Sequence, residues 1–599
     1  MSLEILKRAD VKKENTWATE DLYATDALWE EDLKRLSEYG DKIAAFEGKL
    51  MDSADNLYNY FKLSDELDIL TDNLFNYASR KSDEDTKNNF YQAMFGKAYS
   101  ELVKVESRSA FFEPELLAAD ESVIEGFYKE KPELEVYRIA INDVVRMKAH
   151  ILSPEEERIL ALAGEISEAP GNINSMLNNA DMKYPSIKDA DGNELRVTHG
   201  SFIPLLESKD ENVRRAAFES LYHTYADFKN TSASILSAQV KQLIFFAKSR
   251  HYNSTLEAAL DGTNVPVSVY KNLIEAVHDN MHYMHKYVRL RKKLMKKDEL
   301  HMYDLYTSIV PTADAKIPFE EAKKTVLEAV KPLGEEYQSI LKEGFDNRWI
   351  DIYENEGKRS GAYSAGALVH PYVLLNYKET LDSQFTLAHE MGHALHSYYS
   401  NHTQPTCYRH YRIFVAEVAS TCNEALLMEH LLAKTTDKME RAYLINYFLE
   451  QFRTTLYRQT MFAEFEMKIN EMVENGESLT ADELCKLYRE LNIEYYGEDI
   501  VVDHEIDMEW ARIPHFYYNF YVFQYATGYS AAIALSRRIL NEGESAVKDY
   551  LGFLKGGCSK DPVSLLRGAG VDMATKEPVN AALKLFGELI DELDELLAE

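Results

Sequence analysis

Two histidines and a glutamate in the spacing H-E-x-x-H carry the clearest chemical meaning in this sequence. His389 and His393 lie four residues apart, so on an α-helix their imidazoles share one face and can reach a single metal ion. Glu390 is offset from that pair and can hydrogen-bond a water on the metal without taking a coordination position. The spacing predicts a helical zinc site of the hydrolytic type.

The third ligand has to come from elsewhere in the chain, because a catalytic zinc usually takes three protein ligands and one water. Metzincins place a histidine ten residues after the first, but Tyr399 stands there and His396 replaces the expected glycine, so that class is excluded. Glu417 lies among apolar residues in the helical segment 412–432, where an unpaired carboxylate would be costly. We therefore predict Glu417 as the third ligand of one Zn²⁺ per chain. The alternative is a helical core with two incidental histidines.

Glu424 follows Glu417 by seven residues and shares its helical face. It is a candidate acceptor for a hydrogen bond from a ligand histidine, and a solvated glutamate is the alternative. Other histidines near these segments are expected to be packed or supporting groups rather than ligands. They are His370, His396, His410 and His504.

Composition indicates a large, mainly α protein. Of 599 residues, 45% are hydrophobic, and only 25 are glycine and 15 proline, which favours long helices. A net charge of −33 argues against nucleic-acid and membrane-surface partners. Four scattered cysteines give no disulfide framework, and neither a signal peptide nor an apolar membrane span is evident. We expect a cytoplasmic protein.

Amphipathic patterns predict helices over residues 27–46, 53–77, 85–107 and 154–168. Asp191-Gly192 separates two short alternating segments and predicts a small hairpin. We place a boundary near residue 195, which gives an N-terminal helical domain (1–195), a wall or lid, and a catalytic domain (196–599).

A strand-like run, residues 372–377, precedes the helix that carries the metal motif, and Thr380 or Asp382 can cap that helix. Two roles are open for the strand. It is either an ordinary core strand or an edge strand that pairs with an extended peptide. In the second case Val373, Leu374 and Leu375 bind the substrate.

Several segments together resemble the oligoendopeptidase F group of the thimet-oligopeptidase-like zinc peptidases. They are RADVKKENTWATEDLY (8–23), HEMGHALH (389–396), FVAEVAST (414–421), IPHFYYNFYVFQYATGYSAA (513–532) and FLKGGCSKDPVSLLRGAGVDM (553–573). The resemblance implies a multi-helix ellipsoid divided by a deep channel that admits short unstructured peptides. It also implies zinc on the channel floor, bound by His389, His393 and Glu417, with Glu390 as the base.

Residues 515–529 are rich in tyrosine, a pattern that usually reflects core packing. However, Tyr521, Tyr525 and Tyr529 recur every four residues, so three hydroxyls can line one helix face. The resemblance implies that His515, Tyr525 and Tyr529 stabilise the oxyanion of peptide hydrolysis, and Tyr521 is a substrate-binding candidate.

The function predicted from these residues and the resemblance is zinc-dependent endoproteolysis of short peptides. One alternative is a dipeptidyl carboxypeptidase or metallocarboxypeptidase on the same scaffold, which needs a cation such as Arg359 or Arg412 for the terminal carboxylate. Another is a helical binding scaffold with a vestigial metal motif. The oligomeric state is open.

Overall fold

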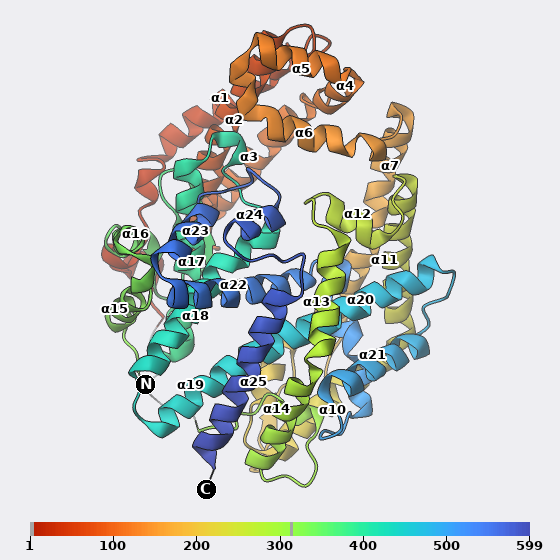
Figure 1. Cartoon of the computed structure of the whole chain (residues 1–599), viewed down its shortest axis with the longest axis vertical. Helices are drawn as coiled ribbons and strands as arrows, with labels where there is room; N and C mark the ends of the chain where they lie inside the picture. The colour runs from red at the N-terminus through yellow and green to blue at the C-terminus, as the bar shows by residue number, and fades with distance from the viewer. Residues whose placement is uncertain (1–4, 312–315, 599) are drawn as a thin grey trace. The chain divides into compact units, whose positions relative to one another are not determined.

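Helices make up most of the chain, as the scarcity of glycine and proline predicts (Figure 1). The structure is a computed structural model, and it describes residues 5–311 and 316–598. The expected mainly α fold, with a small β element next to the motif-bearing helix, is confirmed. Among the described residues, no helix is both long and apolar enough to cross a membrane.

The chain divides into two compact units, each made of three separate stretches. Unit 1 comprises Met1–Ala149, Ala315–His430 and Leu535–Gly570, and unit 2 comprises His150–Asp314, Leu431–Ala534 and Val571–Glu599. The expected boundary near residue 195 falls within unit 2, in a hairpin. The division into 1–195 and 196–599 as an N-terminal and a catalytic domain stays a prediction.

Unit 1 begins with three long helices that pack against one another: α1 (Asp26–Ala44), α2 (Ala54–Glu84) and α3 (Asn89–Ser107). Thr25 and Ser53 cap the first two, because each side chain accepts a backbone N–H of the first turn. All three were expected, and α2 continues past its expected end at residue 77. The other helices that begin in this unit are α4 (Phe112–Ala118), α5 (Glu121–Glu130), α6 (Arg138–Arg146), α15 (Phe319–Ala329), α16 (Glu335–Asp346), α17 (Leu381–Thr403), α18 (Ala416–Lys434), α23 (Glu544–Leu554) and α24 (Pro562–Gly568).

A three-stranded sheet precedes α17, the helix that carries the H-E-x-x-H pattern. The strand order is β3–β5–β4. In this sheet β3 (Ile350–Asp351) is parallel to β5 (Tyr372–Leu374), and β4 (Tyr363–Ala365) is antiparallel to β5. The expected strand over 372–377 therefore exists as the shorter β5, at the centre of the sheet. β4 is an edge strand, and α17 packs against it.

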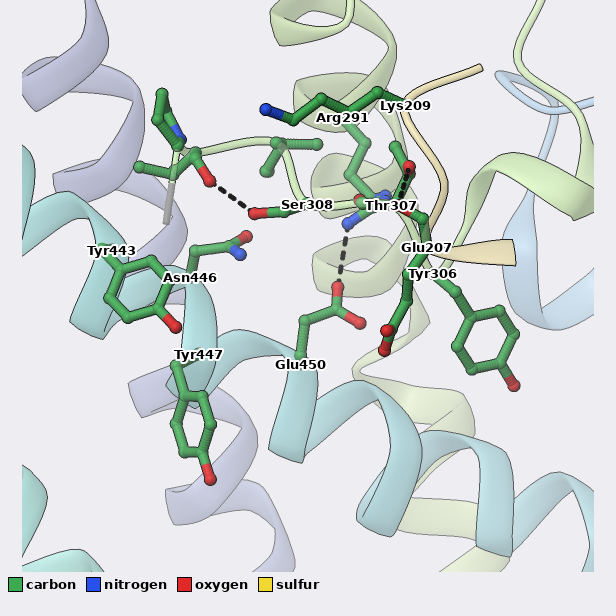
Figure 2. A pocket seen from close by; sticks show the side chains of 13 residues that line it. Glu207, Lys209, Arg291, Tyr306, Thr307, Ser308, Tyr443, Asn446, Tyr447 and Glu450 are labelled. Atoms are coloured by element: carbon green, nitrogen blue, oxygen red, sulfur yellow. Dashed lines mark hydrogen bonds and ion pairs between the residues drawn. The ribbon is translucent and has the colours of Figure 1, made fainter. Parts of the chain in front are cut away.

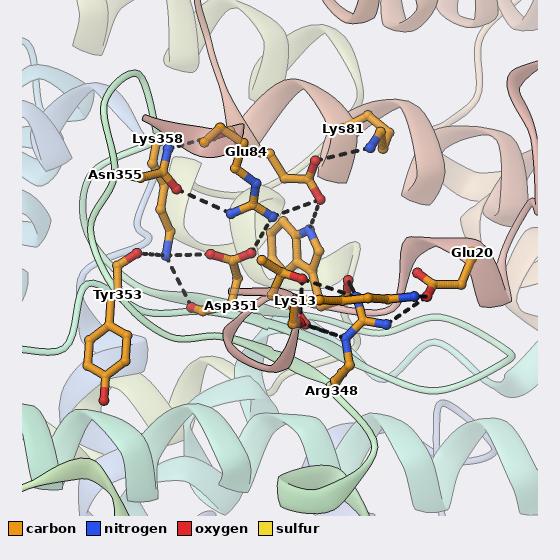
Figure 3. A network of polar contacts seen from close by, with 12 residues as sticks. Lys13, Glu20, Lys81, Glu84, Arg348, Asp351, Tyr353, Asn355 and Lys358 are labelled. Atoms are coloured by element: carbon orange, nitrogen blue, oxygen red, sulfur yellow. Dashed lines mark hydrogen bonds and ion pairs between the residues drawn. The ribbon is translucent and has the colours of Figure 1, made fainter. Parts of the chain in front are cut away.

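Two cations neutralise the buried carboxylate of Asp351 in β3 (Figure 3). Arg8 Nη2 lies 2.6 Å from Asp351 Oδ2, and Lys358 Nζ lies 2.7 Å from Oδ1. Lys358 Nζ also donates to the carbonyl oxygens of Tyr353, at 2.7 Å, and Leu375, at 2.5 Å. Burial lowers the pKa of Lys358, and the charge of Asp351 opposes that effect. Because each buried charge has a partner, the network can anchor the sheet rather than weaken it.

Unit 2 contains the expected hairpin, in which β1 (Ile187–Lys188) pairs antiparallel with β2 (Glu194–Leu195). Gly192 takes a positive φ of 83° in its turn, which suits glycine. The helices that begin in this unit are α7 (Pro154–Ser167), α8 (Ala169–Met176), α9 (His199–Leu206), α10 (Glu211–Asp227), α11 (Lys229–Ser249), α12 (Thr255–Asp261), α13 (Val267–Asp279), α14 (Met281–Leu294), α19 (Lys438–Gln451), α20 (Arg458–Glu474), α21 (Ala481–Tyr496), α22 (Phe523–Glu542) and α25 (Glu577–Leu597).

Candidate metal centre

The backbones of α17 and α18 come into close contact at Gly392, between the two motif histidines. A Cβ atom at Gly392 would lie 2.6 Å from Ser420 Cα and 2.7 Å from the Ala419 carbonyl oxygen, closer than real Cβ contacts. Only glycine fits there without a shift of one helix. This close approach brings the first turn of α18 to the histidines of α17.

The three predicted ligands converge on one point. Nε2 of His389 and Nε2 of His393 each lie 3.3 Å from Oε2 of Glu417. The three atoms are close enough to one another to hold a single metal ion. Tetrahedral zinc with bonds of about 2.0–2.2 Å would separate its ligand atoms by about 3.3–3.6 Å. The donor types and their spacing therefore fit zinc.

Glu390 lies next to His389 on α17 and is only 7% exposed. Burial raises the pKa of Glu390, while the charges of His389 and His393 lower it. Burial would also raise the pKa of Glu417, but hydrogen bonds from the two histidines hold it below its usual range. The carboxyl groups on α17 and α18 thus have different environments, as a base and a ligand require.

Glu424 accepts a hydrogen bond from His389, with 2.5 Å between Oε1 and Nδ1. A carboxylate can only accept, so the proton is on Nδ1, which leaves Nε2 of His389 available to a metal. Of the two roles left open for Glu424, the structure shows the acceptor of a histidine hydrogen bond and not a solvated glutamate. Asn423 was not singled out, although its Nδ2 donates to the Ala388 carbonyl oxygen at 3.2 Å and its Oδ1 accepts from Tyr337 at 2.9 Å. An asparagine within a helix gives no sequence signal of such a contact.

Three of the residues predicted to stabilise the oxyanion or bind substrate lie together in unit 2. The Tyr525 hydroxyl is 3.4 Å from His515 Nε2. The ring of Tyr521 is nearly parallel to that of His515, with 6.3 Å between centroids, and lies edge-on to Tyr525 at 5.5 Å. Burial lowers the pKa of His515, so the neutral imidazole is favoured. The cluster offers N–H and O–H donors.

The expectation that three tyrosines share one helix face is wrong for Tyr521, because α22 begins only at Phe523. Asn519 and Phe520, directly before Tyr521, have positive φ angles of 50° and 56°, and this left-handed backbone cannot be part of a right-handed helix. Tyr529 lies one turn beyond Tyr525 on α22. It is 4% exposed, and its ring packs edge-on against Phe452 at 5.1 Å.

Sequence models of two families match most of the chain. Peptidase family M3 matches residues 204–585, and Oligopeptidase F matches residues 115–184. Oligopeptidase PepF of Bacillus subtilis (strain 168) is 48% identical over 591 residues, which cover 98% of this chain and 88% of the relative. The chain belongs to peptidase family M3.

Solved structures agree with this assignment. Oligoendopeptidase-F from Enterococcus faecium is 40% identical, with a TM-score of 0.75 over 96% of this M3 peptidase and 99% of that chain. A protein from Chlamydophila abortus is 34% identical, with a TM-score of 0.92 over 99% of this chain and 100% of the other. The resemblance inferred from the motifs is confirmed, and the chain is a peptidase.

The expected edge strand of this M3 peptidase requires a correction. Val373 and Leu374 are fully buried in β5, and Leu375 is 1% exposed. Val373 N–H donates to the Trp349 carbonyl oxygen and Leu375 N–H to that of Asp351, both at 2.8 Å, while β4 pairs with the opposite side of β5. Val373, Leu374 and Leu375 therefore cannot pair with a peptide. Sequence reasoning missed β4, where the sheet has an edge.

The four other histidines lie outside the group of His389, His393 and Glu417 that could hold a metal ion. His396 is buried on α17, and burial lowers its pKa to about 3. Their neighbours are Trp349 and Asp21 for His370, Tyr411 for His396, Asp68 for His410 and Asp507 for His504.

A second group in the described residues, His278, Glu464 and Glu494, has a donor set that could hold a metal. However, Nε2 of His278 faces Glu464 at 2.7 Å, and Nδ1 faces Glu494 at 3.0 Å. The two carboxylates thus lie at different ring nitrogens. Lys468 Nζ also lies 2.7 Å from Glu464. The contacts are those of an ion-pair cluster.

A cavity of about 640 Å³ lies in unit 2, and none of the residues that line it is predicted to act in the reaction (Figure 2). Its buried cation is Arg291, which lies 2.9 Å from Glu450 and donates to the Thr307 carbonyl oxygen at 2.6 Å. Tyr443 and Tyr447 of α19 line another side. Because Glu450 already balances Arg291, the cavity has no obvious charge preference.

Proposed function

We propose that this chain is a zinc-dependent endopeptidase that hydrolyses short, unstructured oligopeptides. One observation carries the proposal. Nε2 of His389 and of His393 each lie 3.3 Å from Oε2 of Glu417, and Glu390 follows His389 directly on α17. The names of two relatives, an oligopeptidase and an oligoendopeptidase, support oligopeptides as substrates.

In this proposal His389, His393 and Glu417 hold the zinc. When bound, zinc supplies a Lewis acid that polarises a carbonyl group and makes water more acidic. Glu390 takes the proton of the attacking water and passes it to the leaving amine nitrogen, and this proton transfer is worth about 10²–10⁴-fold in rate. Glu424 keeps His389 in the tautomer that leaves Nε2 free.

His515, Tyr525 and Tyr529 are assigned to the developing oxyanion, where each donor stabilises the transition state by about 3–4 kcal/mol. The 3.4 Å contact between Tyr525 and His515 supports a shared role. Tyr521, beside both, is assigned to substrate binding.

In this proposal the backbone of the peptide substrate pairs with β4 and not with β5. β4 has a strand partner on one side only among the described strands, and it packs against α17. An extended peptide can add to such an edge through main-chain hydrogen bonds.

Two contacts favour an endopeptidase over an exopeptidase. Arg412 lies 2.8 Å from Asp143, and Arg359 lies 3.5 Å from Asp83. Both candidate cations for a terminal carboxylate thus have acidic partners.

The test uses a mixed peptide library in which some members are blocked at both ends, analysed by mass spectrometry with and without chelator. We expect one zinc per chain by elemental analysis and internal cleavage of blocked peptides. Cleavage of unblocked peptides only would identify an exopeptidase, and chelator-insensitive cleavage would remove the metal from the mechanism.

Three expectations stay predictions: a channel with residues 1–195 as its wall or lid, a cytoplasmic location, and a lack of nucleic-acid and membrane partners.

A further inference from the structure

The chain reverses sharply just before α22, at two consecutive residues with left-handed backbone. Asn519 has φ of 50° and Phe520 has φ of 56°. This conformation is unfavourable for residues with a Cβ, and it is more unusual for phenylalanine than for asparagine. Such a pair persists only where surrounding contacts hold it in place.

Glu466 of α20 makes the polar contact that holds this reversal. The Phe520 N–H donates to Glu466 Oε1 at 2.7 Å. Glu466 is 1% exposed, and its Oε2 has no hydrogen-bond partner among the described residues. The ring of Phe520 is also buried, edge-on to Tyr270 at 5.7 Å between centroids. One hydrogen bond and one aromatic contact therefore fix the left-handed residue.

The carboxyl of Glu466 has no cation to balance it in the described structure. Burial raises its pKa to about 8, and the Phe520 N–H acts in the opposite direction. The titratable side chain near Glu466 is Tyr270 of α13, whose pKa is raised by burial first and also by the charge of Glu466. The Tyr270 hydroxyl donates to the Ala463 carbonyl oxygen at 2.6 Å and not to Glu466. Glu464, on the same helix, is paired with Lys468 instead. Burial without a cationic partner thus favours the neutral form of the Glu466 carboxyl.

The reversal has a direct geometric result, because it returns the chain to His515. Tyr521 follows the left-handed pair at once and lies parallel to the His515 ring, and Tyr525 reaches His515 Nε2 at 3.4 Å. A change at Phe520 would move both tyrosines relative to the histidine.

We propose that Glu466 is a positioning residue, which holds the Phe520 N–H and thereby keeps His515, Tyr521 and Tyr525 in one cluster. Its effect on catalysis rests on the proposed function, whereas its effect on the loop rests on the geometry alone. The two can therefore fail separately.

Three variants test the inference. Glu466→Leu removes the acceptor, Glu466→Gln keeps an oxygen acceptor, and Glu464→Gln is a matched control, a second buried glutamate of α20 that contacts His278 and Lys468 instead. We expect Glu466→Leu to lower kcat by about 10–100-fold with little change in KM, because small misplacements of catalytic groups cost that much. Glu466→Gln should restore most of kcat, and Glu464→Gln should leave kcat unchanged even where it lowers Tm.

The pH profile provides a second measurement. The folded-state pKa of Glu466, about 8, lies above its ordinary value of 4.5, so the folded protein binds the extra proton between these values. Stability should therefore fall as pH rises from about 4.5 to about 8 and no further from this source. The alkaline limb of kcat near pH 8 should be weaker in Glu466→Gln, and so should the fall in stability.

Hydrogen exchange of peptides spanning residues 516–524, measured on metal-free protein, separates the two proposals. We expect faster exchange in Glu466→Leu and wild-type exchange in Glu466→Gln and Glu464→Gln. Wild-type exchange in Glu466→Leu would overturn the inference, as would a changed loop with unchanged kcat. A loosened loop in Glu466→Leu, combined with a wild-type protein that cleaves no peptide, would instead overturn the proposed function.

Discussion

The candidate metal centre of unit 1 and the aromatic cluster of unit 2 are built on different kinds of backbone. His389, His393 and Glu417 project from two regular helices, and a glycine brings those helices into contact. His515 and Tyr521 lie on a short 3-10 helix and on irregular chain. Helical spacing therefore determines the first site, whereas side-chain contacts to the loop determine the second.

This difference predicts how each site responds to substitution. Where ligands project from rigid helices, substitution of one ligand should remove that ligand's contribution and leave the other ligands in place. Residues on a strained loop should depend on neighbours that never touch the substrate.

The largest effect is expected at the metal centre. Glu390→Gln should lower kcat by about 10²–10⁴-fold, because the base is lost while the ligands remain. Zinc content, measured by elemental analysis, should stay at one per chain. Glu417→Ala is the matched variant, and it should lose zinc and activity together. Turnover retained in Glu390→Gln would disprove the assignment of the base.

Substitution in the aromatic cluster should come next. His515→Ala should lower kcat by about 10²–10³-fold, as loss of one oxyanion donor does, with zinc content unchanged. Tyr518→Phe is a control, since Tyr518 is exposed nearby. If His515→Ala changed KM alone, His515 would be a binding residue and not an oxyanion donor.

A smaller effect is expected at Glu424, which touches the metal group only through His389. Glu424→Gln should weaken zinc affinity by about 10–100-fold, because the tautomer and orientation of His389 are less well fixed. Competition with a chelator of known affinity measures this. Unchanged affinity would show that the helices alone orient the histidine.

The contact between α17 and α18 should be sensitive to a single methyl group. Gly392→Ala should destabilise the fold by about 1–3 kcal/mol, because the Cβ would overlap the backbone of α18. Gly552→Ala, in α23 with open space around it, should instead stabilise by up to about 1 kcal/mol. Denaturant unfolding compares the two, and equal effects would rule out close contact at Gly392.

The comparison also explains which features could be predicted from sequence. Helix geometry and the cost of burying charge predict that His389, His393 and Glu417 come together, and their donor atoms do lie close to one another. Their role as metal ligands stays a prediction. The central position of β5 depends on pairing with β3, which lies outside the strand's own sequence. The four-residue spacing of the tyrosines predicted that Tyr521 lies on a helix. Such spacing carries no information on the left-handed backbone at residues 519 and 520, which ends the regular structure there.

Lys358 gives the sheet of unit 1 a permanent counter-ion. Its ammonium group is enclosed by the Asp351 carboxylate and by main-chain carbonyl oxygens, so this cation belongs to the polypeptide. A chelator that strips a bound metal ion from the candidate centre cannot remove Lys358. The strands beside α17 should therefore keep their structure in metal-free protein, and returning zinc should restore activity without refolding.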